Sequence, residues 1–260
     1  MQKLSLKNRK GQKIVGVLEV PEGEIKGTCV VQHGYGGQKE AKHIQKMKDV
    51  FLDNGFITFN FDTTNSFGQS DGDFEEARLG LHAEDLEDVA QWMQQQDWFQ
   101  KPFALTGHSM GGYAVAKYAE DYSEKVDILA PIAPVVSGEL SFEATEEKWP
   151  NSLERWKKEG VRIAINKSTG VTKKSPWAQM EERLDHNLLP NAKNITMPTL
   201  LVVGTEDKSC RLKDVKKLYD ALPVNDKNHF AEIQDAPHIY ISDKNLEELY
   251  KIIDSWLKSL

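Results

Sequence analysis

The chain has 260 residues, of which 39% are hydrophobic and 28% are charged, which is enough to bury the core of one large domain. Its formal net charge of −7 argues against nucleic-acid binding, because phosphate recognition needs a concentrated positive surface. No apolar run approaches the roughly 18 residues that a membrane helix needs, and no signal peptide is visible. We therefore expect a soluble, cytoplasmic protein without a membrane span.

The first half of the chain alternates apolar runs with amphipathic segments. Two opening strands flank a turn at residues 8–11, and a buried strand at 28–32 enters the glycine-rich turn at 33–37. The pattern then predicts a helix over 39–54, a strand over 56–61, a turn region over 62–73, a helix over 81–96, a strand over 103–106, a helix over 113–120 and a strand over 127–131. Strands and helices at this spacing predict an α/β fold with a mainly parallel sheet covered on both faces.

The alternation stops between residues 136 and 189. This segment is polar, contains three tryptophans and shows no clear strand. Alternation resumes with a strand at 199–203, a helix at 212–222, a strand at 230–233 and a helix from 246 to the end. We therefore expect a core made of residues 1–135 and 190–260, with residues 136–189 inserted as a lid above the carboxyl ends of the strands.

Neither cysteine indicates a metal site. Cys29 lies in an apolar run, where a small buried side chain is the expected role. Neither Cys29 nor Cys210 has histidine or carboxylate ligands at a suitable spacing, so we expect no metal and no cofactor. A disulfide between the two is not expected in a reducing compartment.

The strongest motif is Gly107-His108-Ser109-Met110-Gly111, which matches G-x-S-x-G. A predicted strand precedes it and a predicted helix follows it. In this setting the serine stands on a sharp, strained turn, where the backbone approaches so closely on both sides that only glycine fits. The alternative is an ordinary glycine-rich turn, but the strand and the helix favour Ser109 as the nucleophile.

A serine hydroxyl needs a base, and the base needs an acid to orient it. After such a turn the chain order is serine, acid and histidine. His238 follows the last strand, whereas His229 precedes that strand and would project at the wrong end of the sheet, so we predict His238 as the base. Glu206 and Asp207 both follow the penultimate strand as candidate acids. Asp235 is a weaker alternative, because it is close enough to His238 in sequence to brace the loop instead.

Acyl transfer also needs two hydrogen-bond donors for the oxyanion. The backbone N–H of Met110, next after the nucleophile, should be one. We assign the second to the backbone N–H of Tyr35, whose ring lines the acyl pocket or packs against the turn. His33 and His108 flank the two turns and should brace them through hydrogen bonds.

Four motifs together carry a family resemblance: HGYGG after one strand, GHSMGG after another, LLVVGTED near the C-terminus and DAPHIY beyond it. With them the chain resembles the α/β-hydrolase superfamily over nearly its whole length. Within the superfamily it is similar to small intracellular carboxylesterases of the cinnamoyl/feruloyl esterase type and to the serine-aminopeptidase-like and monoacylglycerol-lipase-like branch. The segment FNFDTTNSFGQSDG resembles the family's F-D-x-x-G-x-G-x-S-x-G segment, with Ser66-Phe67 in place of the usual glycine–histidine pair.

The resemblance implies an α/β-hydrolase fold with a small lid that selects substrates. It implies Ser109 as nucleophile, His238 as base, Tyr35 and Met110 as oxyanion donors, and it favours Asp207 over Glu206 as the acid. No residue of the lid can be transferred from a known relative. Its tryptophans, Trp149, Trp156 and Trp177, either stack on a ligand or, as we favour, hold the lid together.

We predict a serine carboxylesterase that hydrolyses small, short-acyl or aromatic esters through an acyl-enzyme on Ser109. One alternative is an aminopeptidase or amidase, in which Glu139 or Glu143 of the lid would hold the substrate ammonium. Others are a monoacylglycerol lipase and, less favoured, a non-catalytic binding protein with the same fold. The expected partner is a small-molecule ester, and the sequence leaves a homodimer open.

Overall fold

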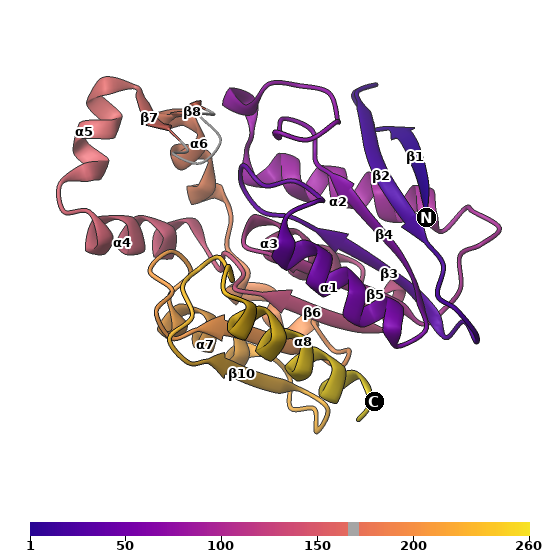
Figure 1. The fold of residues 1–260 in the computed structure, drawn as a ribbon. Coiled ribbons are helices and arrows are strands. Elements are labelled where there is room, and N and C mark those ends of the chain that lie inside the picture. Colours follow the sequence, from indigo (N-terminus) through magenta and orange to yellow (C-terminus); the bar gives the residue numbers. More distant parts are fainter. Residues whose placement is uncertain (166–171) are drawn as a thin grey trace.

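The computed structural model describes residues 1–165 and 172–260 (Figure 1). Its centre is an eight-stranded sheet with the strand order β1-β2-β4-β3-β5-β6-β9-β10. The pairs β1–β2 and β2–β4 are antiparallel, and every other neighbouring pair is parallel. The predicted mainly parallel sheet is therefore confirmed, with its antiparallel part at the edge formed by the start of the chain.

The elements of the core follow the predicted order. The strands are β1 (Gln2–Lys7), β2 (Lys13–Glu19), β3 (Gly27–Gln32), β4 (Phe56–Asp62), β5 (Phe103–His108), β6 (Ile128–Ile132), β9 (Leu200–Gly204) and β10 (His229–Ile233). The α-helices are α1 (Lys42–Asp53), α2 (Leu79–Met93), α3 (Met110–Asp121), α7 (Leu212–Ala221) and α8 (Asp243–Leu257). Short 3₁₀ helices are η1 (Phe74–Glu76), η2 (Ser123–Lys125) and η4 (Leu189–Asn194).

Helices cover both faces of the sheet (Figure 1). Apolar side chains of α1 and α8 pack on one face, and those of α2, α3 and α7 pack on the other. Along β3, Cys29 and Val31 belong to the first layer and Val30 to the second. Successive side chains of a strand point to opposite faces, so a strand covered on both sides is apolar throughout, as this run is.

Between β6 and β9 the chain leaves the sheet and forms a separate group of elements beside α3 and above α7 (Figure 1). We call residues 138–185 the inserted segment; its described elements are α4 (Gly138–Lys148), α5 (Ser152–Glu159), β7 (Val161–Ile165), β8 (Thr172–Pro176), α6 (Trp177–Glu182) and η3 (Arg183–Asp185). The prediction that this segment contains no clear strand is wrong, because β7 and β8 pair as antiparallel strands. Both strands are mostly exposed and β8 is polar. Because neither strand has one buried face, their sequences show no alternation of hydrophobic and polar residues.

Specific hydrogen bonds tie the inserted segment to the core. The Tyr35 hydroxyl donates to Ser175 Oγ of β8 (2.9 Å), and Lys173 Nζ donates to the carbonyl of Gly36 (3.1 Å). The carboxylate of Glu182 accepts from the backbone N–H groups of Leu79 (3.0 Å) and Gly80 (2.9 Å) at the start of α2. A negative charge is favourable at that helix end, where the N–H groups lack intrahelical partners.

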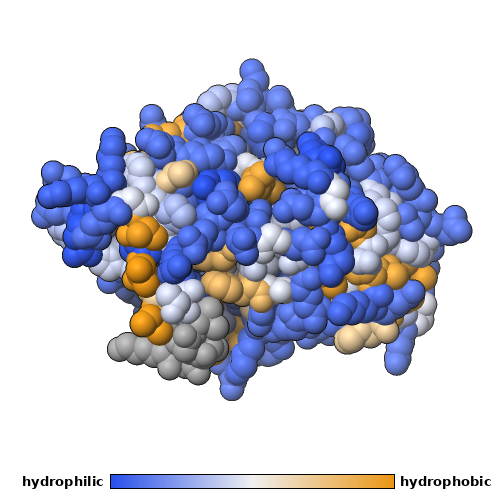
Figure 2. All heavy atoms as spheres, turned by 90° about the horizontal axis from the view of Figure 1, so that it is seen from above, coloured by the Kyte–Doolittle hydropathy of each residue, from blue (hydrophilic) through white to orange (hydrophobic). Residues whose placement is uncertain are grey.

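Seen from above, the surface is mostly hydrophilic (Figure 2). Among the described residues, the exposed hydrophobic side chains include Ile163 and Ile165 of β7. In the part of the chain that the structure describes, no helix is both long enough and apolar enough to cross a membrane.

Candidate active site

Ser109 stands at the junction of β5 and α3, in a backbone conformation that few residues other than glycine adopt. Its φ is 60° and its ψ is −115°. The glycines on either side are sterically required: a Cβ on Gly107 would lie 2.4 Å from the carbonyl oxygen of Gly111, and a Cβ on Gly111 would lie 2.4 Å from that of Gln32. The crowding that the G-x-S-x-G motif predicts is therefore present, and it holds the serine in a strained turn.

The structure brings Ser109, His238 and Asp207 into one hydrogen-bonded chain. Ser109 Oγ and His238 Nε2 are 3.0 Å apart, and His238 Nδ1 lies 2.7 Å from Asp207 Oδ2. A carboxylate can only accept, so Nδ1 donates to Asp207 and Nε2 is left to accept from the serine hydroxyl. The other oxygen of Asp207 accepts from the backbone N–H groups of Ser209 (2.8 Å) and Cys210 (2.9 Å), which fixes this buried carboxylate.

The alternative residues do not reach this chain of bonds. Glu206 is exposed, and its backbone N–H donates to Ala236 O (3.0 Å). Asp235 has a positive φ of 58°, and its backbone N–H donates to Thr205 Oγ1 (2.9 Å), so it braces the loop. His229 begins β10, at the opposite end of that strand from the loop that holds His238.

His33 and His108 brace the two turns, as predicted. His108 Nε2 donates to the backbone carbonyl of His238 (2.8 Å), and thereby holds the loop of that histidine. His33 Nδ1 donates to the carbonyl of Gly34 (2.8 Å), and its Nε2 accepts from the N–H of Thr63 (3.0 Å). Burial lowers the pKa of both rings, and a neutral His33 is what its accepting nitrogen requires.

The turn at residues 33–37 lies directly against the nucleophile. A Cβ on Gly34 would be 2.8 Å from Ser109 Cβ, so the backbone of the turn passes next to the serine. Met110 is the first residue of α3, where backbone N–H groups lack intrahelical acceptors. Within the described residues, the N–H groups of Tyr35 and Met110 have no protein acceptor, which leaves both able to donate to a ligand.

A cavity of about 190 Å³ opens above Ser109 and His238. The core contributes the Tyr35 ring to its wall, and the inserted segment contributes Trp149 and Trp156. The Tyr35 ring therefore lines the cavity while its hydroxyl binds Ser175. The third tryptophan, Trp177, packs edge-on against Trp156 and Phe142, which fits the role of holding the segment together.

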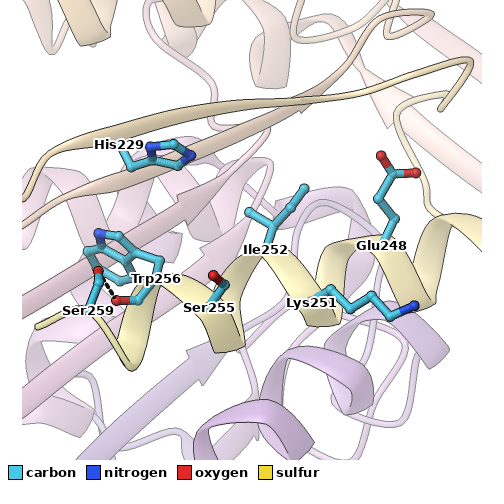
Figure 3. Close-up of a pocket in the computed structure, with 7 residues that line it drawn as sticks. All are labelled: His229, Glu248, Lys251, Ile252, Ser255, Trp256 and Ser259. Carbon is cyan, nitrogen blue, oxygen red and sulfur yellow. Dashed lines mark hydrogen bonds between the residues drawn. The ribbon is translucent and has the colours of Figure 1, made fainter.

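A larger hollow, of about 370 Å³, lies between the start of β10 and α8 (Figure 3). Its lining side chains are His229, Glu248, Lys251, Ile252, Ser255, Trp256 and Ser259, and none of them lines the cavity over Ser109. The figure shows His229 across from the helix, without a bond to either serine. The hollow thus lacks the nucleophile–base pairing that is present at Ser109.

The suggestion that Glu139 or Glu143 would hold the ammonium group of an aminopeptidase substrate is wrong. Neither lines the cavity. Glu143 is exposed and pairs with Arg211 (2.9 Å) on the outside. The cavity wall instead carries the positive side chains Lys148, Arg162, Arg183 and Lys208, which sequence reasoning missed. No sequence signal singles them out, because basic residues in a polar segment look like a solvated surface.

Comparison with known proteins identifies the family of the chain. A family model described as "Serine aminopeptidase, S33" matches residues 23–245. The chain belongs to this family. It is a hydrolase of the α/β-hydrolase superfamily, which confirms the resemblance drawn from the four motifs.

Relatives and solved structures of similar fold span nearly the whole chain. An uncharacterised 31.7 kDa protein of the traX-finO intergenic region of Escherichia coli is 23% identical over 269 residues, covering 92% of this chain and 93% of its own. Est1E from Butyrivibrio proteoclasticus with bound ferulic acid is 20% identical with a TM-score of 0.76, and 98% of each chain is covered. Alpha/beta hydrolase domain-containing protein 10 from mouse is 18% identical with a TM-score of 0.78, covering 100% of this chain and 99% of its own. The α/β-hydrolase fold predicted from the sequence is confirmed.

Proposed function

We propose that the protein is a serine carboxylesterase for small esters, with Ser109 as nucleophile, His238 as general base and Asp207 as the acid that orients it. The observation that carries the proposal is the continuous hydrogen-bonded chain from Ser109 through His238 to Asp207, at 3.0 and 2.7 Å, on the floor of a cavity. A nucleophile within reach of a base, and a base held by a third group, is the arrangement that acyl transfer needs.

The reaction has two halves. Ser109 Oγ attacks the ester carbonyl while its proton passes to His238 Nε2, and the N–H groups of Tyr35 and Met110 stabilise the oxyanion. The C–O bond to the alcohol then breaks, and His238 returns the proton to the leaving alkoxide. Water hydrolyses the acyl-enzyme by the same proton transfers, which releases the carboxylic acid and restores Ser109.

The size of the cavity supports small esters over long acyl chains. We propose that residues 136–189 are a cap that sets this limit, since its side chains Trp149, Trp156 and Arg162 line the same cavity as Ser109. Two solved structures of similar fold support ester chemistry: Est1E with bound ferulic acid, and an esterase domain from Rhodothermus marinus with a TM-score of 0.69 and 16% identity over 99% of this chain.

The family description keeps an aminopeptidase as the second candidate. A substrate with a free ammonium would need a carboxylate in the cavity, and among the described lining residues there is none. The positive wall therefore favours the esterase.

The test is hydrolysis of p-nitrophenyl esters from acetyl to long acyl chains, measured for the wild type, Ser109→Ala and Ser255→Ala. We expect turnover that peaks at short chains, is lost in Ser109→Ala and is kept in Ser255→Ala, which removes a hydroxyl from the hollow of Figure 3. If activity is lost in Ser255→Ala but kept in Ser109→Ala, Ser255 is the nucleophile and the assignment of Ser109 is wrong. Hydrolysis of aminoacyl anilides without any hydrolysis of esters would favour the aminopeptidase.

A further inference from the structure

The charged side chains that line the cavity above Ser109, histidine aside, are all positive. Four cationic side chains line it, Lys148 of α4, Arg162 of β7, Arg183 of η3 and Lys208 from the loop after β9. No aspartate or glutamate lines it among the described residues, and Asp207 lies behind His238, bonded to that ring and to two backbone N–H groups. The chain as a whole has a net charge of −7, so this concentration runs against its average composition.

None of these four cations forms an ion pair within residues 1–165 and 172–260. The sequence of residues 166–171, NKSTGV, contains no acidic residue that could supply one. Arg211, just outside the cavity, gives a direct comparison, because it pairs with Asp214 (2.5 Å), Glu147 (2.6 Å) and Glu143 (2.9 Å). The acidic side chains of this region thus neutralise the outer arginine and leave the inner cations without counter-charges.

Neutral contacts hold the two arginines in place. The Arg162 guanidinium lies over the rings of Trp156 (4.4 Å) and Trp149 (5.2 Å). Arg183 donates through Nη2 (2.7 Å) and Nε (2.8 Å) to the side-chain oxygen of the buried Gln179, with that amide turned toward it. Aromatic faces and an amide oxygen orient a guanidinium without cancelling its charge, so the remaining N–H groups are available to an anion.

The pKa values of these cations also indicate that the cavity is suited to a bound anion. Burial lowers the pKa of Arg162 and of Arg183; at Arg183 the nearby charge of Glu182 opposes the lowering and that of Arg162 adds to it. Burial also lowers the pKa of Lys148, and Arg162 and Lys208 lower it further against the opposing charge of Asp207. These cations therefore repel one another in a partly dehydrated cavity, and a bound anion would relieve the repulsion.

We propose that the substrate is an ester that also carries a carboxylate, which Arg162 and Arg183 bind while Ser109 attacks the ester carbonyl. The proposal rests on the esterase function and names its substrate class. A planar carboxylate matches the fork of a guanidinium, and with an ester group it fits a cavity of about 190 Å³. The carboxylate stands in either the acyl or the alcohol part of the ester.

Two matched pairs of substrates test the proposal and separate these two cases. For the acyl part, methyl hydrogen glutarate is compared with the methyl ester of glutaramic acid, in which a neutral amide replaces the carboxylate. For the alcohol part, 3-acetoxypropanoate is compared with 3-acetoxypropanamide. In one pair we expect kcat/KM to be at least about tenfold higher for the acid, with a preference that shrinks as NaCl is added. Equal rates within both pairs, or faster hydrolysis of the amides, would overturn the proposal.

Matched variants locate the carboxylate. Arg162→Gln should lower the ratio of kcat/KM for acid over amide by about tenfold, and Arg162→Lys should restore part of it. Arg155→Gln removes the same charge from an exposed position of α5 outside the cavity, and it should leave the ratio unchanged. Arg183→Gln, which removes the other guanidinium of the proposed site, gives the same test if Arg162→Gln does not fold. An unchanged ratio in the folded Arg162→Gln protein would contradict the assignment.

Binding measured without turnover separates this proposal from the esterase function. Calorimetry with the Ser109→Ala protein should show methyl hydrogen glutarate binding more tightly than the methyl ester of glutaramic acid, and Arg162→Gln should remove the difference. If neither ester is hydrolysed but methyl hydrogen glutarate still binds preferentially, the esterase function fails and the anion site stands. If both esters are hydrolysed at equal rates and methyl hydrogen glutarate shows no preference, the esterase stands and the anion site fails.

Discussion

The floor and the roof of the active-site cavity are built in opposite ways. On the floor, Asp207 and Ser109 are buried, and the Asp207 carboxylate is held by hydrogen bonds from Ser209, Cys210 and His238, which lie in loops after strands. In the roof, formed by the inserted segment, Arg162 lies on aromatic rings and has no counter-ion among the described residues. Fixed geometry serves bond-making, whereas unpaired charge serves recognition of a ligand that arrives from outside.

The floor and the roof also differ in backbone strain. The floor keeps Ser109 at a φ of 60° because Gly107 and Gly111 let the backbone close around it. Such a residue costs about 1–3 kcal/mol and persists only where its surroundings over-determine it. The roof is joined to the core by side-chain hydrogen bonds such as the one between Tyr35 and Ser175. Changes to the floor should thus alter chemistry most, and changes to the roof should alter selection.

The sharpest test of the floor is Ser109→Gly. Loss of the nucleophile should lower kcat by about 10⁶-fold. Because glycine adopts this backbone conformation readily, the same change should raise the free energy of unfolding by about 1 kcal/mol. Ser109→Ala is the control that loses activity without gaining stability. Urea unfolding compares the three proteins, and equal stability of Ser109→Gly and Ser109→Ala would mean that the turn is not strained.

The next largest effect is expected at the acid. Asp207→Asn should lower kcat by about 10⁴-fold, because the amide no longer holds the tautomer of His238 that accepts from Ser109. Glu206→Gln is the matched control one residue away, and its exposed side chain should change kcat by less than about twofold. Ester hydrolysis at neutral pH decides between them. A severe loss in Glu206→Gln with a mild one in Asp207→Asn would reverse the assignment.

Acid should destabilise the core of the protein, because histidines that are buried there stay neutral in the folded state. Burial lowers the pKa of His43 to about 4 and that of His82 to about 3. Between these values and about 6.5 the unfolded chain binds more protons than the folded one, so stability falls as the pH falls through this window. Each histidine should contribute about 1.4 kcal/mol per pH unit. Urea unfolding from pH 7 to pH 5 measures the slope of the unfolding free energy against pH. His82→Met should reduce this slope by the contribution of one histidine. An unchanged slope would mean that His82 is not kept neutral by the folded protein.

The smallest expected effect concerns the junction of floor and roof. Tyr35→Phe removes the hydroxyl that binds Ser175 while keeping the ring in the cavity wall. One lost hydrogen bond of about 1 kcal/mol should lower kcat/KM by about fivefold, mainly through KM. Tyr250→Phe, which loses a surface bond to Asp53, is the matched control and should not change kcat/KM. A fall in kcat alone would mean that the hydroxyl acts on the chemistry instead.

Much of the floor could be predicted because its signals are local. The apolar run of β3, the glycines beside Ser109 and the position of His238 after the last strand are each visible within a few residues. Glu206 and Asp207 could not be separated this way, because neighbours on a loop point in different directions. Only the family resemblance favoured Asp207, which the structure then places 2.7 Å from His238.

By itself, the sequence determined the order of the core elements, the strained serine turn and the superfamily, because local steric and hydrophobic patterns specify them. The tertiary structure alone decided what faces the cavity. Whether Glu143 or Arg162 lines it depends on how a polar segment folds back over the sheet, and the basic residues of that segment carry no periodic signal. Charges acquire their partners only through contacts between distant parts of the chain, and so the selectivity of this site lies in the fold.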